Sequence, residues 1–238
     1  MGARRARETA PTGDHGTPRP MPRPSETALK GRARALLEAM TERARWIYAV
    51  PPEHEALVAP ILEAAGFAPS ARDAEANVTR YANAGDTASF VTFVSAELDV
   101  LFLEAAGGDA AETLGLVLGE TEFYAQSRLL GAALDVRDPE APKALRTLAH
   151  MVVAWDADRS DLFLLHLASP DPVVRHEAVA ALTVAAMVAR EGGPAAELLG
   201  EAARRETFPK LKETMGEALG VIAAALGAPI QATPDPEA

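Results

Sequence analysis

The chain has no cysteine, which excludes several kinds of chemistry at once. It contains no disulfide, no metal site built from thiolates and no cysteine nucleophile. Disulfides are typical of exported proteins, and this chain cannot form one, so we expect a cytoplasmic protein. Aromatic residues make up only 5% of the 238 residues, and runs of β-branched residues are short. These shortages disfavour β-sheet and, with the abundance of alanine, predict closely packed helices.

Long hydrophobic runs are missing as well. The opening segment MGARRARETAPTGDHG contains paired arginines, but no apolar stretch of the kind found in export signals follows it. Apolar stretches with helical spacing are interrupted well before the roughly 18 residues that a membrane span needs. Glycine-rich phosphate loops and serine nucleophile elbows are absent too. We therefore expect neither secretion nor membrane association, and we predict no cofactor.

Positive charge is scarce outside the N-terminal region. Residues 1–50 hold ten basic and five acidic side chains, whereas residues 51–238 hold thirteen and twenty-nine. The acidic body repels phosphate backbones, so we expect no DNA or RNA partner. Residues 1–24 are rich in proline, glycine and arginine and have little apolar surface to bury, which predicts a disordered basic tail. This tail is either a solvated leader or a basic hook for an acidic partner.

The chain contains a repeated pattern of apolar residues after three prolines. Pro139, Pro172 and Pro209 are each followed by apolar residues two, six, nine, ten and thirteen positions later. These offsets place the apolar side chains on one face of a helix, so the pattern predicts three copies of one amphipathic unit. The prolines are 33 and 37 residues apart, which is enough for two helices and two turns. Stacked helix pairs of this kind form a solenoid with an extended surface for binding.

The predicted fold is all-α. From residue 109 onward, proline, glycine and aspartate residues mark where helices begin and end. They predict helices near 109–118, 121–134, 139–154, 159–168, 172–190, 194–204 and 208–226. Earlier helices are predicted over 25–49, 53–65, 70–84 and from Asp86 to Gly107, the last with Phe90, Val94, Leu98, Leu101 and Phe102 at helical spacing. We therefore expect an N-terminal helical subdomain over 25–108, a repeat array over 109–228 and a disordered C-terminal tail over 229–238.

One segment of the array carries a family resemblance. Residues 164–182 read LLHLASPDPVVRHEAVAAL, in which Asp171 and Pro172 open a helix and a Val-Arg pair ending at Arg175 precedes spaced alanines. This segment resembles a HEAT repeat of the short bacterial kind related to phycobilisome lyases. The resemblance covers roughly residues 109–227, with further units at Asp138-Pro139 and at Phe208-Pro209, where Lys212 matches Arg175. It implies an α-α superhelix that acts as a scaffold or adaptor.

Histidines suggest two hypotheses about chemistry. The pair His176-Glu177 resembles the His-Glu pairs of deoxyhypusine hydroxylase, a HEAT-repeat enzyme with two irons, but the matching positions after Pro139 and Pro209 lack histidine. A diiron site needs more ligands than one pair supplies, so we predict no metal site. His150 and His166 lie in adjacent predicted helices, where they form either a pH-sensitive two-histidine contact or ordinary packing.

The predicted function is protein binding without catalysis. Arg175 and Lys212 are expected to pair with acidic residues of the neighbouring repeat and so keep the units in register. The acidic residues Asp161, Glu197 and Glu201 are expected to line a concave face that accepts a basic segment of a protein partner. One alternative is an accessory enzyme or a lyase-like, cofactor-handling factor on the same array. Another is a self-assembling homo-oligomer, in which residues 1–50 of one copy bind the acidic body of the next.

Overall fold

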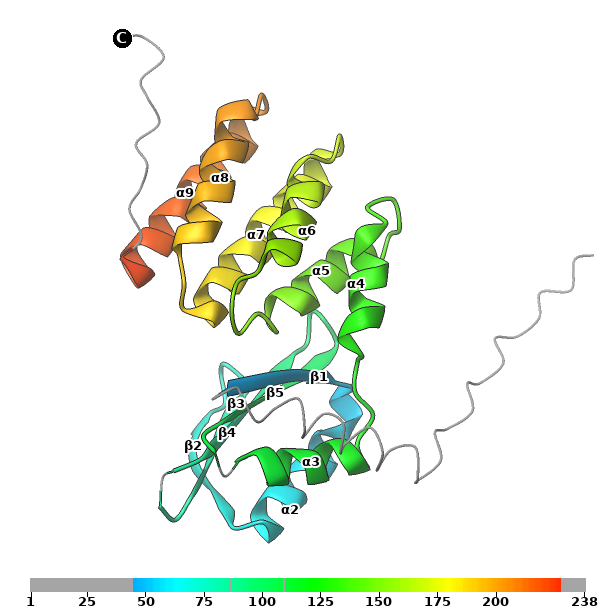
Figure 1. Ribbon diagram of the computed structural model, residues 1–238, viewed down its shortest axis with the longest axis vertical. Helices are drawn as coiled ribbons and strands as arrows, with labels where there is room; N and C mark the ends of the chain where they lie inside the picture. The colour runs from blue at the N-terminus through cyan, green and yellow to red at the C-terminus, as the bar shows by residue number, and fades with distance from the viewer. Residues whose placement is uncertain (1–44, 86, 109, 228–238) are drawn as a thin grey trace, which may run out of the picture.

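A computed structural model of the chain describes residues 45–85, 87–108 and 110–227. Figure 1 shows a β-sheet that lies between two helices on one side and an array of paired helices on the other. The all-α prediction is therefore wrong, because the fold is mixed α and β. The predicted tails over 1–24 and 229–238 lie outside the described residues, as does the predicted first helix up to residue 44.

The sheet is antiparallel throughout and has five strands in the order β1-β5-β4-β3-β2. Its strands are β1 (Arg45–Val50), β2 (Phe67–Asp73), β3 (Val78–Asn83), β4 (Ser89–Ser95) and β5 (Val100–Ala106). Two of the turns end in a left-handed residue, Asn77 before β3 and Asp99 before β5, each with φ of 52°. Asparagine and aspartate tolerate this conformation better than other non-glycine residues, which fixes where the next strand starts.

The helices predicted over 70–84 and 86–107 are wrong, because these segments form β2 to β5. The end of the helix predicted over 25–49 is wrong too, because residues 45–49 lie in β1. Within β5, Leu101 and Leu103 face one side of the sheet and Phe102 faces the other. Both faces are covered, so the strand reads as a continuous apolar run without the alternation that marks a half-exposed strand. In the β2–β3 turn, the carboxylate of Asp73 accepts hydrogen bonds from the backbone amides of Glu75 and Ala76.

Two helices cover one face of the sheet. The turn η1 (Pro52–His54) leads into α2 (Glu55–Ala64), which matches the helix predicted over 53–65 and ends before Gly66. The helix α3 (Ala110–Glu120) packs beside α2, and the two share an apolar core with the sheet that includes Val58, Leu62, Phe90 and Leu114. The first helix predicted for the repeat array thus belongs to the sheet layer.

The remaining helices form three pairs that lie side by side (Figure 1). They are α4 (Gln126–Leu134), α5 (Ala141–Ala149), α6 (Ala157–Leu167), α7 (Pro172–Ala189), α8 (Gly193–Arg205) and α9 (Pro209–Leu226). The helices α5, α7 and α9 pack against one another in one layer, and α4, α6 and α8 form the other. The helix starts predicted from the prolines are confirmed: α7 and α9 begin at Pro172 and Pro209, and α5 begins two residues after Pro139.

Aspartates organise two of these turns. The carboxylate of Asp171 accepts a hydrogen bond from the Val173 amide at 2.8 Å and so caps α7. In the equivalent turn before α5, the carboxylate of Asp138 accepts a hydrogen bond from the Glu140 amide at 2.9 Å. The Asp-Pro pairs seen in the sequence therefore have a physical role, since the acid satisfies a free amide and the proline presets the backbone angle.

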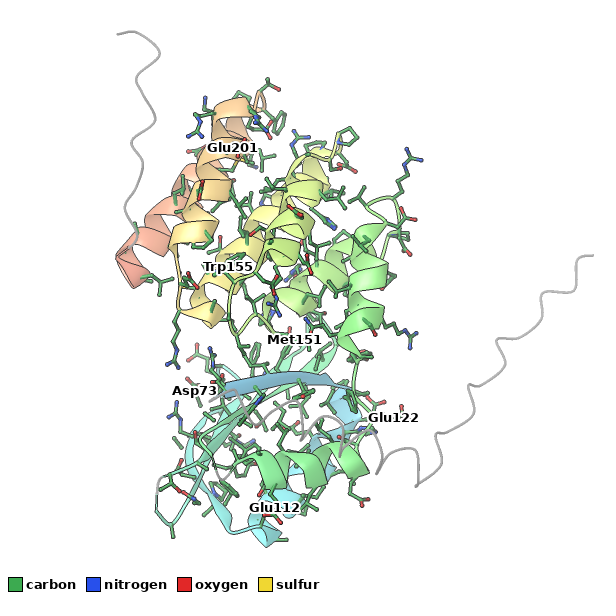
Figure 2. All side chains as sticks on the ribbon, viewed as in Figure 1. Asp73, Glu112, Glu122, Met151, Trp155 and Glu201 are labelled. Carbon is green, nitrogen blue, oxygen red and sulfur yellow. The ribbon has the colours of Figure 1, made fainter. Side chains whose placement is uncertain are left out.

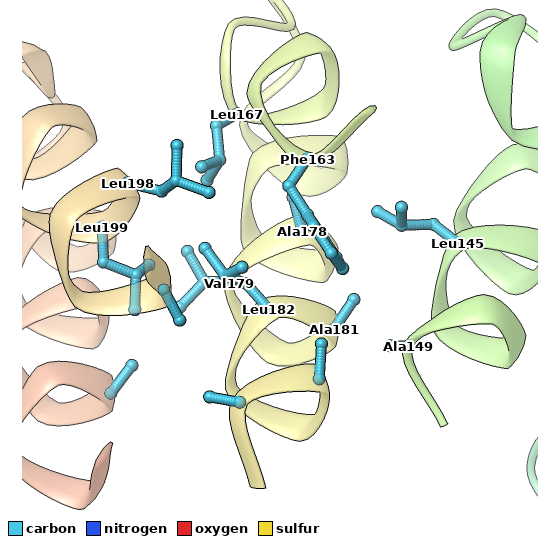
Figure 3. Close-up of a cluster of buried hydrophobic side chains, with 14 of the residues drawn as sticks. Leu145, Ala149, Phe163, Leu167, Ala178, Val179, Ala181, Leu182, Leu198 and Leu199 are labelled. Carbon is cyan, nitrogen blue, oxygen red and sulfur yellow. The ribbon is translucent and has the colours of Figure 1, made fainter. Parts of the chain in front are cut away.

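The predicted apolar stripes form the core of the array, which Figure 3 shows around α7. Leu145 and Met215, six residues after Pro139 and Pro209, and Leu182, ten residues after Pro172, are fully buried in it. Between them, Ala178 and Ala181 have no side chain beyond Cβ, which lets α5 and α9 approach α7 closely. The helix α7 is long and apolar enough to cross a membrane, and 33% of that stretch is buried where it packs against α5, α6, α8 and α9.

Gly107 provides a test of how β5 ends. Its φ is 95°, and a Cβ added there would lie 2.2 Å from the Thr87 carbonyl oxygen. We expect Gly107→Ala to lower the free energy of unfolding by at least about 2 kcal/mol, because backbone strain and the clash add together. Gly216→Ala is the matched control: the site is helical with open space around it, so stability should stay the same or rise by up to about 1 kcal/mol. Urea unfolding of both variants measures the difference, and equal stabilities would contradict this account.

Candidate functional site

The second face of the sheet packs against the helical array. Ala49, Val100 and Phe102 from the sheet form a buried cluster with Met151, which follows α5 and lies at this junction in Figure 2. Polar contacts reinforce it, since the Arg45 guanidinium binds the Glu104 carboxylate at 2.6 and 3.1 Å and also donates to the Val188 carbonyl oxygen near the end of α7. The first described residue therefore ties the sheet to the array.

His150 lies inside this junction. Its ring stacks on Phe102 at a centroid distance of 4.6 Å and on Phe93 at 6.0 Å. The Nδ1–H donates to the Arg146 carbonyl oxygen at 2.9 Å, because a carbonyl oxygen can only accept. Burial lowers the pKa of His150 by more than the hydrogen bond to the Arg146 carbonyl raises it. The structure thus favours a neutral, packed imidazole.

Arg146 joins three elements in the same region. Its guanidinium donates to Glu97, in the β4–β5 turn, at 2.6 Å and contacts Glu177 on α7 at 3.4 Å. The hydrogen bonds from Arg146 lower the pKa of Glu97, and those carboxylates raise the pKa of Arg146. Glu177 is therefore engaged in an ion pair with the array, while its neighbour His176 is exposed.

His166 is buried in a different place from His150. Its Nε2–H donates to the Ala133 carbonyl oxygen on α4 at 2.7 Å, so this histidine links α6 to α4. Burial lowers its pKa as well. Each histidine thus has its own packing contact, and within residues 45–227, apart from 86 and 109, the structure groups no three metal-ligating side chains of the His, Cys, Asp and Glu types.

Arg175 makes a pair of the kind expected from the repeat pattern. Its guanidinium binds both oxygens of Glu206, at 2.8 and 3.0 Å, and Glu206 lies between α8 and α9 in the next helix pair. It also donates to the Ser169 carbonyl oxygen at 2.8 Å. The hydrogen bond from Arg175 lowers the pKa of Glu206, whose side chain is only 4% exposed. In contrast, no ion pair of Lys212 occurs among the described residues.

The predicted acidic residues lie on α6 and α8. Asp161 and Glu197 are exposed, and Glu201 pairs with Arg205 on its own helix. Glu201 also lines a cleft of about 260 Å³ between these helices, beside the Arg175–Glu206 pair. The helices of this layer contact one another less than α5, α7 and α9 do. The acidic residues therefore lie in the layer formed by α4, α6 and α8, and the concave placement expected for them stays a prediction.

A groove that the sequence did not indicate lies between the starts of α7 and α9. Val173 is 65% exposed and Phe208 is 51% exposed. They border a space of about 350 Å³ whose other lining residues are Pro172, His176, Lys210, Leu211 and Thr214. Both exposed side chains fall outside the five repeated offsets, so the core pattern does not include them. The one available signal is an apolar residue directly next to each helix-opening proline.

Comparison with protein-family models, with curated proteins and with solved structures finds no match for this chain. The HEAT resemblance therefore stays a prediction from residues 164–182. The functional interpretation depends on the packing, charge and exposure of the described residues.

Stability should depend on pH through His150. Since the folded state holds its pKa below the usual value of 6.5, the unfolded chain takes up a proton first as the pH falls. The free energy of unfolding should therefore decrease as the pH falls below about 6.5. Urea unfolding at pH 7.5 and 5.5 measures this loss, which His150→Phe should reduce and the exposed control His176→Gln should not. His166 should retain part of the pH dependence of stability in this variant, since burial lowers its pKa as well. If His150→Phe lost as much stability between pH 7.5 and 5.5 as the parent chain, His150 would not be the source of the pH dependence.

The Arg175–Glu206 pair should contribute more than an ordinary surface pair. Arg175→Ala leaves a nearly buried carboxylate without its partner, so we expect a loss of more than about 1 kcal/mol in the free energy of unfolding. Arg205→Ala removes a pair whose arginine is 76% exposed, and the expected loss is about 0 to 1 kcal/mol. Thermal unfolding near pH 7 compares the two variants, and a smaller effect for Arg175→Ala would show that the pair does not hold the repeats together.

Proposed function

We propose that the protein is a non-catalytic adaptor with a HEAT-like array, and that it binds a protein partner through the groove between α7 and α9. The observation that carries this proposal is the exposure of Val173 and Phe208 on opposite sides of one groove. Large apolar side chains that gather at the surface mark sites of protein association more often than isolated ones do. Two helices with separate buried stripes hold these side chains in place, so the groove is rigid before binding.

The lining of the groove indicates the chemistry of the partner. Its floor and walls are apolar, from Pro172, Val173, Phe208 and Leu211, and Lys210 and His176 supply polar groups at the border. An apolar side chain fits the floor, and a neighbouring carboxylate would meet the Lys210 ammonium. We therefore expect the partner to present an apolar residue flanked by an acidic one.

The titratable groups support a structural rather than a catalytic use. Active sites commonly contain residues whose pKa is shifted away from its ordinary value. Among the described residues, the shifted groups are Tyr81, Glu97, Tyr124, Arg146, His150, His166 and Glu206. Packing or ion pairing accounts for each of these shifts, and none of these residues lines the groove between α7 and α9.

The acidic residues in the layer of α4, α6 and α8 offer a second surface for a partner. Asp161 and Glu197 are exposed there and would attract a basic segment, as the charge of the chain predicts. The two surfaces require opposite chemistry, because one accepts an apolar and acidic segment and the other a basic one. Variants can therefore distinguish them.

Loss of a specific partner tests the proposal. Phe208→Asp places a charge in the apolar groove and should reduce retention of a co-purifying protein from native lysate at least about tenfold, the loss expected when a central apolar contact is removed. Leu116→Asp is the matched control, since Leu116 is 55% exposed on α3, on the other side of the molecule. Quantitative mass spectrometry of captured proteins, with circular dichroism to verify folding, compares both variants with the parent chain.

The charge-reversal pair Asp161→Lys and Glu197→Lys completes the experiment. If the groove is the docking site, these substitutions leave retention within about twofold of the parent, because they lie on α6 and α8. Retention that survives Phe208→Asp and is lost on charge reversal would overturn the groove proposal in favour of the acidic layer. Equal losses for Phe208→Asp and Leu116→Asp would show that the capture is nonspecific.

A further inference from the structure

A second groove follows the outer edge of β1. It measures about 240 Å³ and lies where the edge strand meets the α3–α4 connection and the loop after α5. Aromatic side chains dominate its lining, which consists of Trp46, Ile47, Tyr48, Phe123, Tyr124, Ala125, Gln126, Met151, Val153 and Arg159. Four of the chain's twelve aromatic residues therefore meet at one edge of the sheet. The groove is separate from the one between α7 and α9.

The outer edge of β1 offers backbone hydrogen-bonding groups to this groove. The Ala49 carbonyl oxygen accepts the Tyr124 amide at 2.8 Å on that edge. Because backbone groups alternate along a strand, Ile47 also presents its N–H and C=O to the outer edge. The Trp46 side chain lines the groove, but its indole nitrogen is buried, so it supplies apolar surface and no hydrogen bond to a ligand. The free backbone amide favours an extended ligand whose carbonyl groups can accept from it.

Negative charge surrounds the groove. Glu53 and Asp99 lie close enough to Tyr124 to raise its pKa, after the larger effect of partial burial. Glu122 is exposed beside Phe123 at the groove wall, on the side of the molecule where Figure 2 labels it. The one basic lining residue, Arg159, already binds Asp156 and the Ala154 carbonyl oxygen. Arg128 also lies near Tyr124 and offsets part of this charge, so a ligand with positive side chains meets a surface on which the carboxylates of Glu53, Asp99 and Glu122 outnumber the free arginine.

The same chain contains a segment with this chemistry. Residues 18–24 read PRPMPRP, in which prolines alternate with two arginines and a methionine. Such a sequence favours the polyproline II conformation, which has three residues per turn and leaves its carbonyl groups free to accept hydrogen bonds. Pro18, Met21 and Pro24 then share one face, and Arg19 and Arg23 extend from the others. Aromatic-lined grooves are the usual receptors for this kind of segment.

We propose that the Pro18–Pro24 segment binds in the aromatic groove along β1 of its own chain. Twenty residues separate Pro24 from Arg45, which begins β1 directly before Trp46, the first lining residue of the groove. A connection of that length spans up to about 65 Å when extended and about 30 Å as a helix, so it allows the segment to return. The tether keeps the segment at a high effective concentration, so weak individual contacts suffice. The basic N-terminal region thus neutralises part of the acidic body.

Site-specific photocrosslinking of the full chain tests this proposal. Met21→Cys introduces the only thiol, because the parent chain has no cysteine, and a benzophenone maleimide attached there reacts on irradiation. Peptide mapping by mass spectrometry should find crosslinks to residues 45–50 and 121–128, with a yield that does not change over a tenfold dilution. A probe at Thr9→Cys serves as the positional control and should give these crosslinks at a severalfold lower yield.

Two surface variants make the test specific. Gln126 is exposed and lines the groove, so Gln126→Arg should lower the crosslink yield severalfold by repelling Arg19 and Arg23, and Gln126→Glu should preserve or raise it. Ser127→Arg adds the same charge at the next exposed position, which does not line the groove, and should have a smaller effect. Replacing Pro20 and Pro22 by glycine should also reduce the yield, since it removes the preset conformation.

The crosslinking results distinguish binding of the Pro18–Pro24 segment to its own chain from binding to a second copy. Crosslinks that join isotopically distinct copies and fall on dilution would overturn binding within one chain and show instead that the segment binds a second copy. Crosslinks distributed over the acidic surface, or insensitive to Gln126→Arg, would overturn the groove as the site. None of these results depends on the proposed adaptor function, because the readout involves no other protein.

Discussion

Burial of both faces of one sheet is the constraint on which the rest of the structure depends. With α2 and α3 on one face and the helical array on the other, the inner strand β5 must place apolar side chains on both sides. The array is held to this sheet by the stack of His150 on Phe102 and by the ion pair between Arg146 and Glu97. These contacts fix the position of α5, and α5 in turn positions α7 and α9 through the shared layer.

The helical part could be predicted from the sequence because each helix carries its own signals. Pro172 and Pro209 mark helix starts, and small residues such as Ala181 recur on one face at helical spacing, so local residues were sufficient. The sheet could not be predicted in this way. Phe90, Val94 and Leu98 satisfy a helical spacing by accident, because they span a strand and a turn, and only pairing with distant strands decides the conformation.

The functional surfaces were even less visible in the sequence. Arg175 could be placed against an acidic neighbour because its position repeats, but the identity of Glu206 depends on how the helix pairs stack. Phe208 and Val173 look like ordinary apolar residues until their exposure is known. The aromatic groove at β1 combines residues more than a hundred positions apart, so no local pattern could have indicated it. Predictions from periodicity thus identify the core more readily than the surface.

The far edge of the sheet has a consequence for the behaviour of the protein at high concentration. Among the described strands, β2 has a neighbour on one side only, and every residue after Phe67 in it is exposed. An open strand of this kind is a template for another chain, but here Pro69 lacks an amide, the pairing shifts between Pro69 and Ala71, and Arg72 and Asp73 carry charge. These features obstruct the addition of a further strand. The sheet is thereby protected from growing into a continuous intermolecular ribbon, the first step toward amyloid-like aggregation.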